Sequence, residues 1–136
     1  MTNPYAAAKA AYQDSAVTTA SPARVVVMAY ERLILDCERA LACFDTKLPA
    51  GKHLMHAQDL VLALQSNLKL DVWDGAARLS SLYSHIYQEL IAANVLRDAS
   101  KVRACMDLMS PLLDAWRQAE LAVGAQPSGS GTIAVA

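Results

Sequence analysis

The sequence has few aromatic residues, few charged residues and no strongly basic segment. Aromatics make up 6% of the 136 residues, and Asp, Glu, Lys and Arg together make up 18%, with a formal net charge of -1. Without a basic run, there is no electrostatic signal for binding nucleic acid or an anionic membrane. No apolar stretch approaches the roughly 20 residues of a membrane span, and the N-terminus lacks the apolar core of a secretory signal. We therefore expect a soluble, cytoplasmic protein with no nucleic-acid partner and no membrane insertion.

Patterns that carry chemistry are also missing. Cys37, Cys43 and Cys105 show no CxxC spacing and fall in apolar helical patterns, so we expect three buried, reduced thiols. His53 and His56 are three residues apart, but no carboxylate or thiol has matching spacing, which favours a solvated pair. Nucleotide-binding, zinc-protease and serine-hydrolase motifs do not occur. We expect no enzymatic activity, no metal and no cofactor; a metal or redox bundle is the least favoured alternative.

Apolar residues recur at spacings of three and four in four long segments, which predicts an all-α fold. Ser21 and Pro22 provide an N-cap and a first helical residue. The expected helices cover about residues 21–45, 52–70, 76–93 and 99–123, and Asp98 is the expected N-cap of the last one. The apolar stripes expected to face the core include Leu33, Cys37, Val61, Leu64, Ile86, Leu90, Val102, Cys105, Met109 and Leu112. Short connections favour antiparallel neighbours, and hence an up-down four-helix bundle. Pro111 predicts a kink in the last helix, or two short helices that meet near Ser110.

The chain divides into three parts. Residues 1–20 are expected to form an N-terminal arm, with or without a short extra helix. Residues 21–123 form the helical bundle domain. Residues 124–136, which are rich in glycine and serine, are expected to be a flexible C-terminal tail.

The predicted helices have more apolar surface than one bundle core needs. A bundle helix normally buries one stripe of about 100°, whereas each helix here shows a second apolar set beside or opposite that stripe. These second sets are Met28 and Leu35, Met55 and Leu62, Tyr87 and Ile91, and Met106 and Leu113. At any single position the alternative is burial between helices. Because all four helices show the feature, we expect either self-association or a groove for a partner's amphipathic segment.

Several short strings, taken together, resemble the flagellar secretion chaperone family FliS. The strings are Asn3-Pro4-Tyr5, Thr19-Ala20-Ser21-Pro22, VVMAYE at residues 26–31, and LIAAN at residues 90–94 followed by Asp98. The resemblance covers about residues 3–122. It implies a helical bundle that binds the disordered C-terminal segment of newly made flagellin in apolar grooves, prevents premature polymerisation and aids type III export.

The resemblance also implies roles for individual residues. It places the N-terminal arm near the binding grooves, which marks Tyr5 and Tyr12 as partner-binding residues; anchoring the arm to the bundle is the alternative. Tyr30 matches the family pattern, but its helical phase favours the core. Asn94 also matches, and helix capping is its simpler explanation. Further partners on this interpretation are the flagellar export gate and, as a weak homodimer, a second copy. The alternative function is a homo-oligomeric structural protein without a flagellin client.

Overall fold

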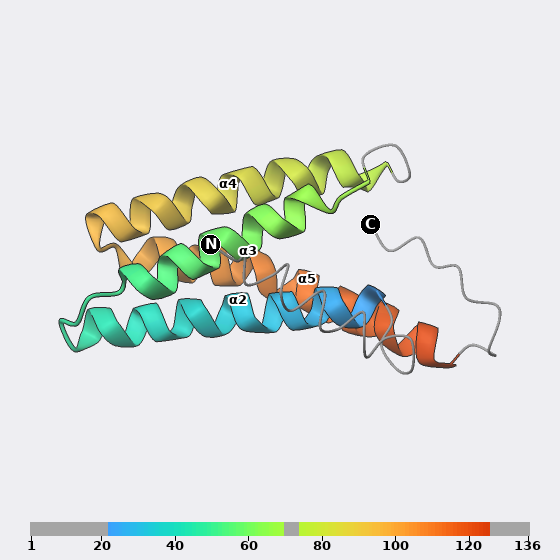
Figure 1. The fold of residues 1–136 in the computed structure, drawn as a ribbon, viewed down its shortest axis with the longest axis horizontal. Coiled ribbons are helices and arrows are strands. Elements are labelled where there is room, and N and C mark those ends of the chain that lie inside the picture. The colour runs from blue at the N-terminus through green and yellow to red at the C-terminus, as the bar shows by residue number, and fades with distance from the viewer. Residues whose placement is uncertain (1–21, 70–73, 126–136) are drawn as a thin grey trace.

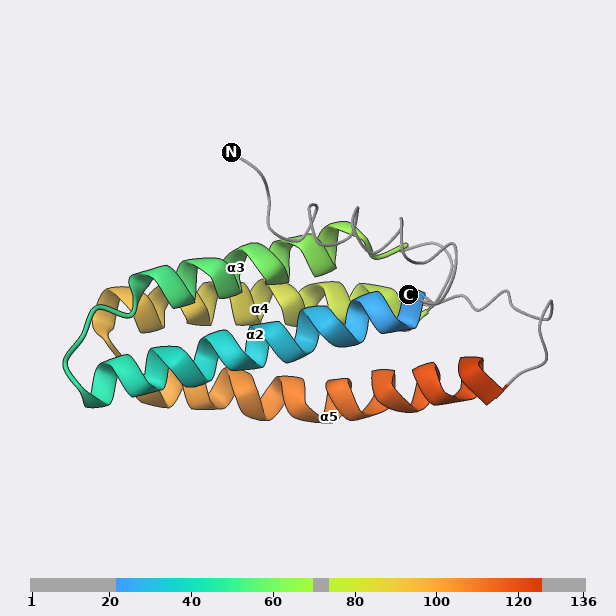
Figure 2. The ribbon, with the colours of Figure 1, turned by 60° about the horizontal axis from the view of Figure 1, so that its bottom comes forward.

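The structure is a computed structural model that describes residues 22–69 and 74–125. Its helices are α2 (Pro22–Asp45), α3 (Gly51–Ser66), α4 (Gly75–Leu96) and α5 (Ala99–Ala125) (Figure 1). Each helix packs against the next, and α5 returns to pack against α2, so α2 and α4 lie diagonally across the bundle. The views in Figures 1 and 2 show the four helices running side by side. The predicted antiparallel four-helix bundle is confirmed. The expected arm lies outside the described residues.

Three helix boundaries differ from the predicted ones. α3 ends at Ser66 rather than Leu70, because the Asn67 backbone and side-chain amides both donate to the Ala63 carbonyl oxygen. α4 continues to Leu96, through the expected break that begins at Asn94, and ends where Arg97 adopts a left-handed φ of 52°. α5 reaches Ala125, two residues into the expected tail.

The closed end of the bundle, where α2 leads into α3 and α4 into α5, is tied together by Arg97. Its Nη2 donates to the Leu48 carbonyl oxygen at 3.1 Å, and its guanidinium lies 4.9 Å from the centroid of the Phe44 ring. Asp98 then caps α5, as predicted, by accepting from the Ser100 backbone N–H at 3.0 Å. The hydrogen bonds from Ser100 hold the pKa of Asp98 below its ordinary value.

α5 stays one helix across Pro111, so the alternative of two short helices is wrong. Proline removes one backbone donor and crowds the carbonyl one turn earlier. The Ser110 hydroxyl donates to the Met106 carbonyl oxygen at 2.9 Å in the same turn. No helix within the described ranges is long and apolar enough to cross a membrane.

A tyrosine pair joins the diagonal helices through the core. Tyr30 of α2 and Tyr83 of α4 are buried, and their hydroxyl oxygens lie 2.5 Å apart. Their rings are 6.4 Å apart at the centroids. Burial raises the pKa of Tyr30, while hydrogen bonds with Tyr83 and Trp116 act in the opposite direction. The prediction that Tyr30 faces the core is confirmed. Around the pair pack the residues predicted as the core stripes, including Leu33, Cys37, Val61, Leu64, Ile86, Leu90, Val102, Cys105 and Met109.

A buried carboxylate links α2 to α3. Asp36 is 1% exposed, and its Oδ2 forms a hydrogen bond with Nδ1 of the half-buried His56. Its Oδ1 lies 3.3 Å from Arg32 Nε, but no hydrogen bond forms to that oxygen. The expectation that His53 and His56 are both simply solvated is therefore wrong for His56. A buried charge that keeps few partners is costly, so His56 matters to folding.

We expect His56→Ala to lower the free energy of unfolding by about 2 kcal/mol, because it leaves the Asp36 carboxylate buried with one partner fewer. Urea denaturation would measure the loss. The matched control is His53→Ala, one turn earlier on α3, which should cost less than about 0.5 kcal/mol. In a double-mutant cycle, Asp36→Ala with His56→Ala should cost clearly less than the two single changes added together. Strict additivity would show that the pair contributes nothing.

Candidate binding groove

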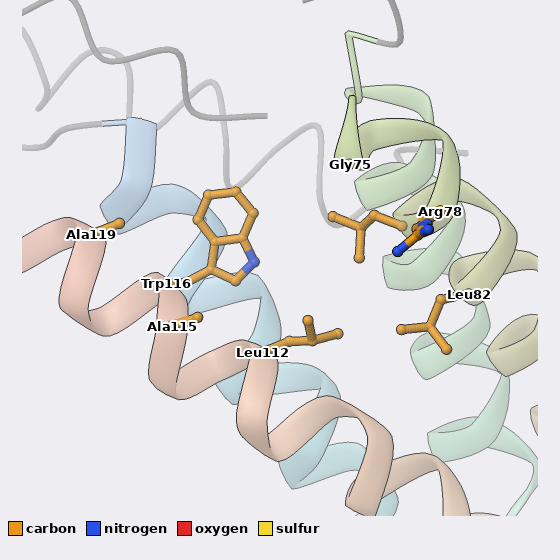
Figure 3. Close-up of a pocket in the computed structure, with 8 residues that line it drawn as sticks. Gly75, Arg78, Leu82, Leu112, Ala115, Trp116 and Ala119 are labelled. Atoms are coloured by element: carbon orange, nitrogen blue, oxygen red, sulfur yellow. The ribbon is translucent and has the colours of Figure 1, made fainter. Parts of the chain in front are cut away.

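An open groove lies between α4 and α5. The end of α4 and the start of α5 lie close together at the Arg97 turn, and the two helices diverge toward the other end of the bundle (Figure 1). The groove has a volume of about 400 Å³. It is lined by Gly75, Arg78, Leu79, Leu82, Leu112, Ala115, Trp116 and Ala119. Figure 3 shows Leu112 and Trp116 of α5 facing Leu82 and Arg78 of α4 across the opening. Apart from Arg78, its lining side chains are apolar.

The ion pairs of α5 change partner along its length. Near the closed end, Lys101 Nζ of α5 lies 3.1 Å from Glu89 Oε2 of α4. Farther along, the charged partners of α5 are on α2 instead. Arg117 pairs with Glu31 at 3.0 Å, and Glu120 pairs with Arg24 at 3.4 Å. Half-exposed pairs of this kind contribute little stability. They mark the change of neighbour, because the second half of α5 packs on α2 while a groove opens toward α4.

The small lining residues leave the groove open, and the large ones form its walls. Gly75, Ala115 and Ala119 project little or no side chain into it, whereas Leu82, Leu112 and Trp116 form its sides. Trp116 is half-buried and packs against the core, and its side chain acts on the pKa of the Tyr30 hydroxyl. Arg78 is exposed at the edge. This geometry fits an apolar helix or strand with polar atoms toward solvent.

The sequence pattern assigned two leucines to the wrong places. Leu112 was expected in the core row but is half-buried and lines the groove. Leu113 was expected on the second stripe but is 6% exposed and belongs to the core. Adjacent residues on a helix differ by about 100° in direction, so a small error in phase exchanges them. The signal that could have found the groove is the run of Leu112, Ala115, Trp116 and Ala119 at spacings of three and four.

Four of the predicted partner-binding residues lie along α3 and α4. Met55 is 58% exposed, Leu62 is 39% exposed and Ile91 is 37% exposed, while Tyr87 is half-buried. Gln65 of α3 fixes the register of these helices by donating to the Ser80 carbonyl oxygen at 2.9 Å and to Ser84 Oγ at 2.7 Å. Since the helices are antiparallel, Leu62 and Tyr87, each one turn from this link, lie at the same level.

The remaining predicted residues are dispersed. Met28 and Leu35 are half-buried on α2, and Met106 is half-buried on α5. Tyr5 and Tyr12 lie outside the described residues. Asn94 is within α4 rather than at its end, and its side-chain oxygen would lie 3.6 Å from a Cβ added at Gly51, the first residue of α3. The structure therefore places the predicted residues on several faces, and it adds the α4/α5 groove to them.

The described residues offer little reactive chemistry. Within residues 22–69 and 74–125, no three His, Cys, Asp or Glu side chains are grouped so that they could hold a metal ion. Burial, with the nearby Cys105, raises the pKa of Cys37 to about 12, and burial raises the pKa of Cys105 to about 11. Cys43 is only half-buried, so the expectation of three buried thiols is wrong for that residue.

Thiol modification should separate these cysteines. At about pH 8 we expect Cys43 alone to react promptly with a disulfide reagent such as dithionitrobenzoate. Cys37 and Cys105 stay protonated because the raised pKa values lie well above that pH, and the thiolate is the nucleophile. The absorbance of the released product would count the thiols, with Cys43→Ser as the control and an unfolded sample as the reference for all three. Rapid release by three thiols in the folded protein would contradict the structure.

Two comparisons with known proteins identify the same family. The sequence model of the family described as "Flagellar protein FliS" matches residues 3–123 of this chain. The "Flagellar secretion chaperone FliS" of Bacillus subtilis (strain 168) is 27% identical over 134 residues, which is 97% of each chain. The two comparisons cover the bundle and the sequence strings that suggested the resemblance.

Proposed function

The chain belongs to the FliS family of flagellar proteins, and from that premise we propose that it binds the disordered C-terminal segment of flagellin in its apolar grooves. The observation that carries the proposal is the open groove between α4 and α5. Its apolar lining, with one charged residue at the edge, fits the apolar face of an amphipathic segment that orders on docking. The chain would then act as a cytoplasmic export chaperone rather than as an enzyme.

A client segment that is disordered before it binds needs a long contact with the bundle. A disordered segment loses conformational entropy when it orders, and burial of apolar surface must offset that cost. One groove of about 400 Å³ holds only a few side chains. The exposed Met55, Leu62 and Ile91 extend the apolar surface onto α3 and the outer side of α4. We therefore propose that the client follows the bundle beyond the groove.

Holding this segment would have two consequences for assembly. A flagellin whose C-terminal segment is ordered on the chaperone has no free segment for premature polymerisation. The complex would also present an unfolded subunit to the type III export gate, which we propose as a second, transient partner. The alternative is that Met55, Leu62 and Ile91 pack against a second copy of the chain, as a weak homodimer or a larger structural oligomer. Sedimentation of the purified protein separates the two, because a monomer leaves these residues free for a client.

Calorimetry with the flagellin C-terminal segment tests the groove. We expect Leu112→Glu to weaken binding by about tenfold or more, because it places a charge against the apolar wall that the client covers. The matched control is Ala104→Glu, an equally charged change at an exposed position of α5 outside the groove. Absence of binding by the unaltered protein at micromolar concentrations would overturn the proposed function. Equal effects of both changes would overturn the choice of groove.

Substitutions on the other faces show how far the client extends. Leu62→Glu on α3 and Met28→Glu on α2 should each weaken flagellin binding while far-UV helicity and melting stay nearly unchanged. Leu62 is 39% exposed, so a charge there reaches water when no client is bound. Calorimetry and thermal melts on the same samples separate the two effects. A large loss of stability would show that the altered residue belongs to the core and not to a client surface.

A further inference from the structure

One wall of the α4/α5 groove, helix α5, is followed in the sequence by an uncharged segment. α5 forms one wall of the groove and ends at Ala125, and residues 126–136 follow. Between Leu121 and Ala136 the sequence has no charged residue, and it ends in Thr-Ile-Ala-Val-Ala. We propose that Ile133 and Val135 occupy this groove in the free protein and are displaced when a client binds. The inference rests on the same groove as the proposed function.

The distances allow this return. At 1.5 Å per residue, Ala119 lies about 9 Å before the end of α5 and Leu112 about 20 Å before it. The eight residues from Ala125 to Ile133 extend to about 26 Å at most. Gly129 and Gly131 supply the backbone freedom that a reversal requires. Ile133 therefore reaches the level of Trp116 and Leu112 when the chain turns back along α5.

The side-chain spacing matches as well. In an extended segment Ile133 and Val135 point to the same side, about 7 Å apart. Leu112 and Trp116, one helical turn apart on the groove wall, are separated by about 6 Å along α5. Each apolar side chain of the segment can thus contact one turn of the helix. The small Ala115 and Ala119 leave space for a backbone to approach.

Because residues 126–136 are covalently attached to α5, they can occupy the groove even if their intrinsic affinity for it is weak. A short flexible connection gives an attached segment an effective concentration on the order of millimolar. An intrinsic affinity in the same range then fills the groove about half of the time. The N-terminal arm is a less suitable occupant, because it joins α2, which contributes no lining residue, and it carries Lys9 and Asp14. When residues 126–136 cover the groove, a client can bind only to the fraction of molecules whose groove is open. The apparent affinity for the client falls in proportion to that open fraction.

Trp116 reports directly on this groove. In a Trp73→Phe background it is the single tryptophan, since the chain has two. We expect Ile133→Asp with Val135→Asp to shift its emission to longer wavelength and to raise its acrylamide quenching constant about twofold. The matched control, Ser128→Asp with Ser130→Asp, adds the same charge to the same segment and should change neither. If the two double variants behave alike, the proposal is wrong.

Other occupants would give different results. If removal of residues 1–20 exposes Trp116 and the Ile133 and Val135 changes do not, the arm fills the groove and the proposal is overturned. If quenching rises on dilution in step with dissociation of a dimer, a second copy fills it. A second measurement uses Ala115→Cys with Cys43→Ser, because Cys37 and Cys105 stay protonated. Its alkylation rate should rise a few-fold with Ile133→Asp and Val135→Asp, and an unchanged rate would also overturn the proposal.

Flagellin binding then separates this inference from the proposed function. Both experiments above use the free protein, so their outcome does not depend on any client. If the chain binds flagellin, the Ile133→Asp, Val135→Asp variant should bind about two- to fivefold more tightly than the control variant. If Trp116 is exposed in that variant but no form of the protein binds flagellin, the contact between residues 126–136 and the groove is supported. The proposed flagellin client is then wrong.

Discussion

The hydroxyl contact between Tyr30 and Tyr83 sets the geometry on which the rest of the bundle depends. Neighbouring helices can slide and rotate on apolar contacts, but this buried pair joins two diagonal helices and needs one register to form. A buried polar group left without a partner is costly, so alternative registers are disfavoured. Trp116 contacts the same hydroxyl, and through it the position of α5 is linked to the core. The binding groove is thus built on a rigid centre.

The open groove and the closed core lie side by side in one bundle, and the ion pairs of α5 follow that division. Arg117 and Glu120 hold the second half of α5 to α2, while Lys101 holds its beginning to α4. The core is continuous along the bundle, but α4 and α5 separate from each other toward their far ends. The fold thus stays closed around its core while apolar surface remains available in the groove.

Periodicity predicted much of the fold because it reports which side of a helix is buried. It predicted the four helices, the core position of Tyr30 and the cap at Asp98. It could not report how helices diverge, so the groove was missed and Leu112 and Leu113 were exchanged. It also missed the contact between Asp36 and His56, because two polar residues on different helices give no periodic signal. Met55 and Leu62 were placed outside the core correctly, since they lie to one side of a clear apolar stripe; their role toward a partner stays a prediction.

The turn at Arg97 makes the width of the groove depend on the angle between α4 and α5. The chain joins α4 to α5 at that end, where Arg97 also contacts Leu48 and Phe44, so the angle between the two helices has its largest effect at their far ends. α4 has 22 residues and is about 33 Å long, so a change of about 5° in the angle between the helices alters the opening by about 3 Å. That is close to the difference between accepting an alanine and accepting a leucine. A small difference in helix angle therefore decides which side chains a groove of this kind can hold.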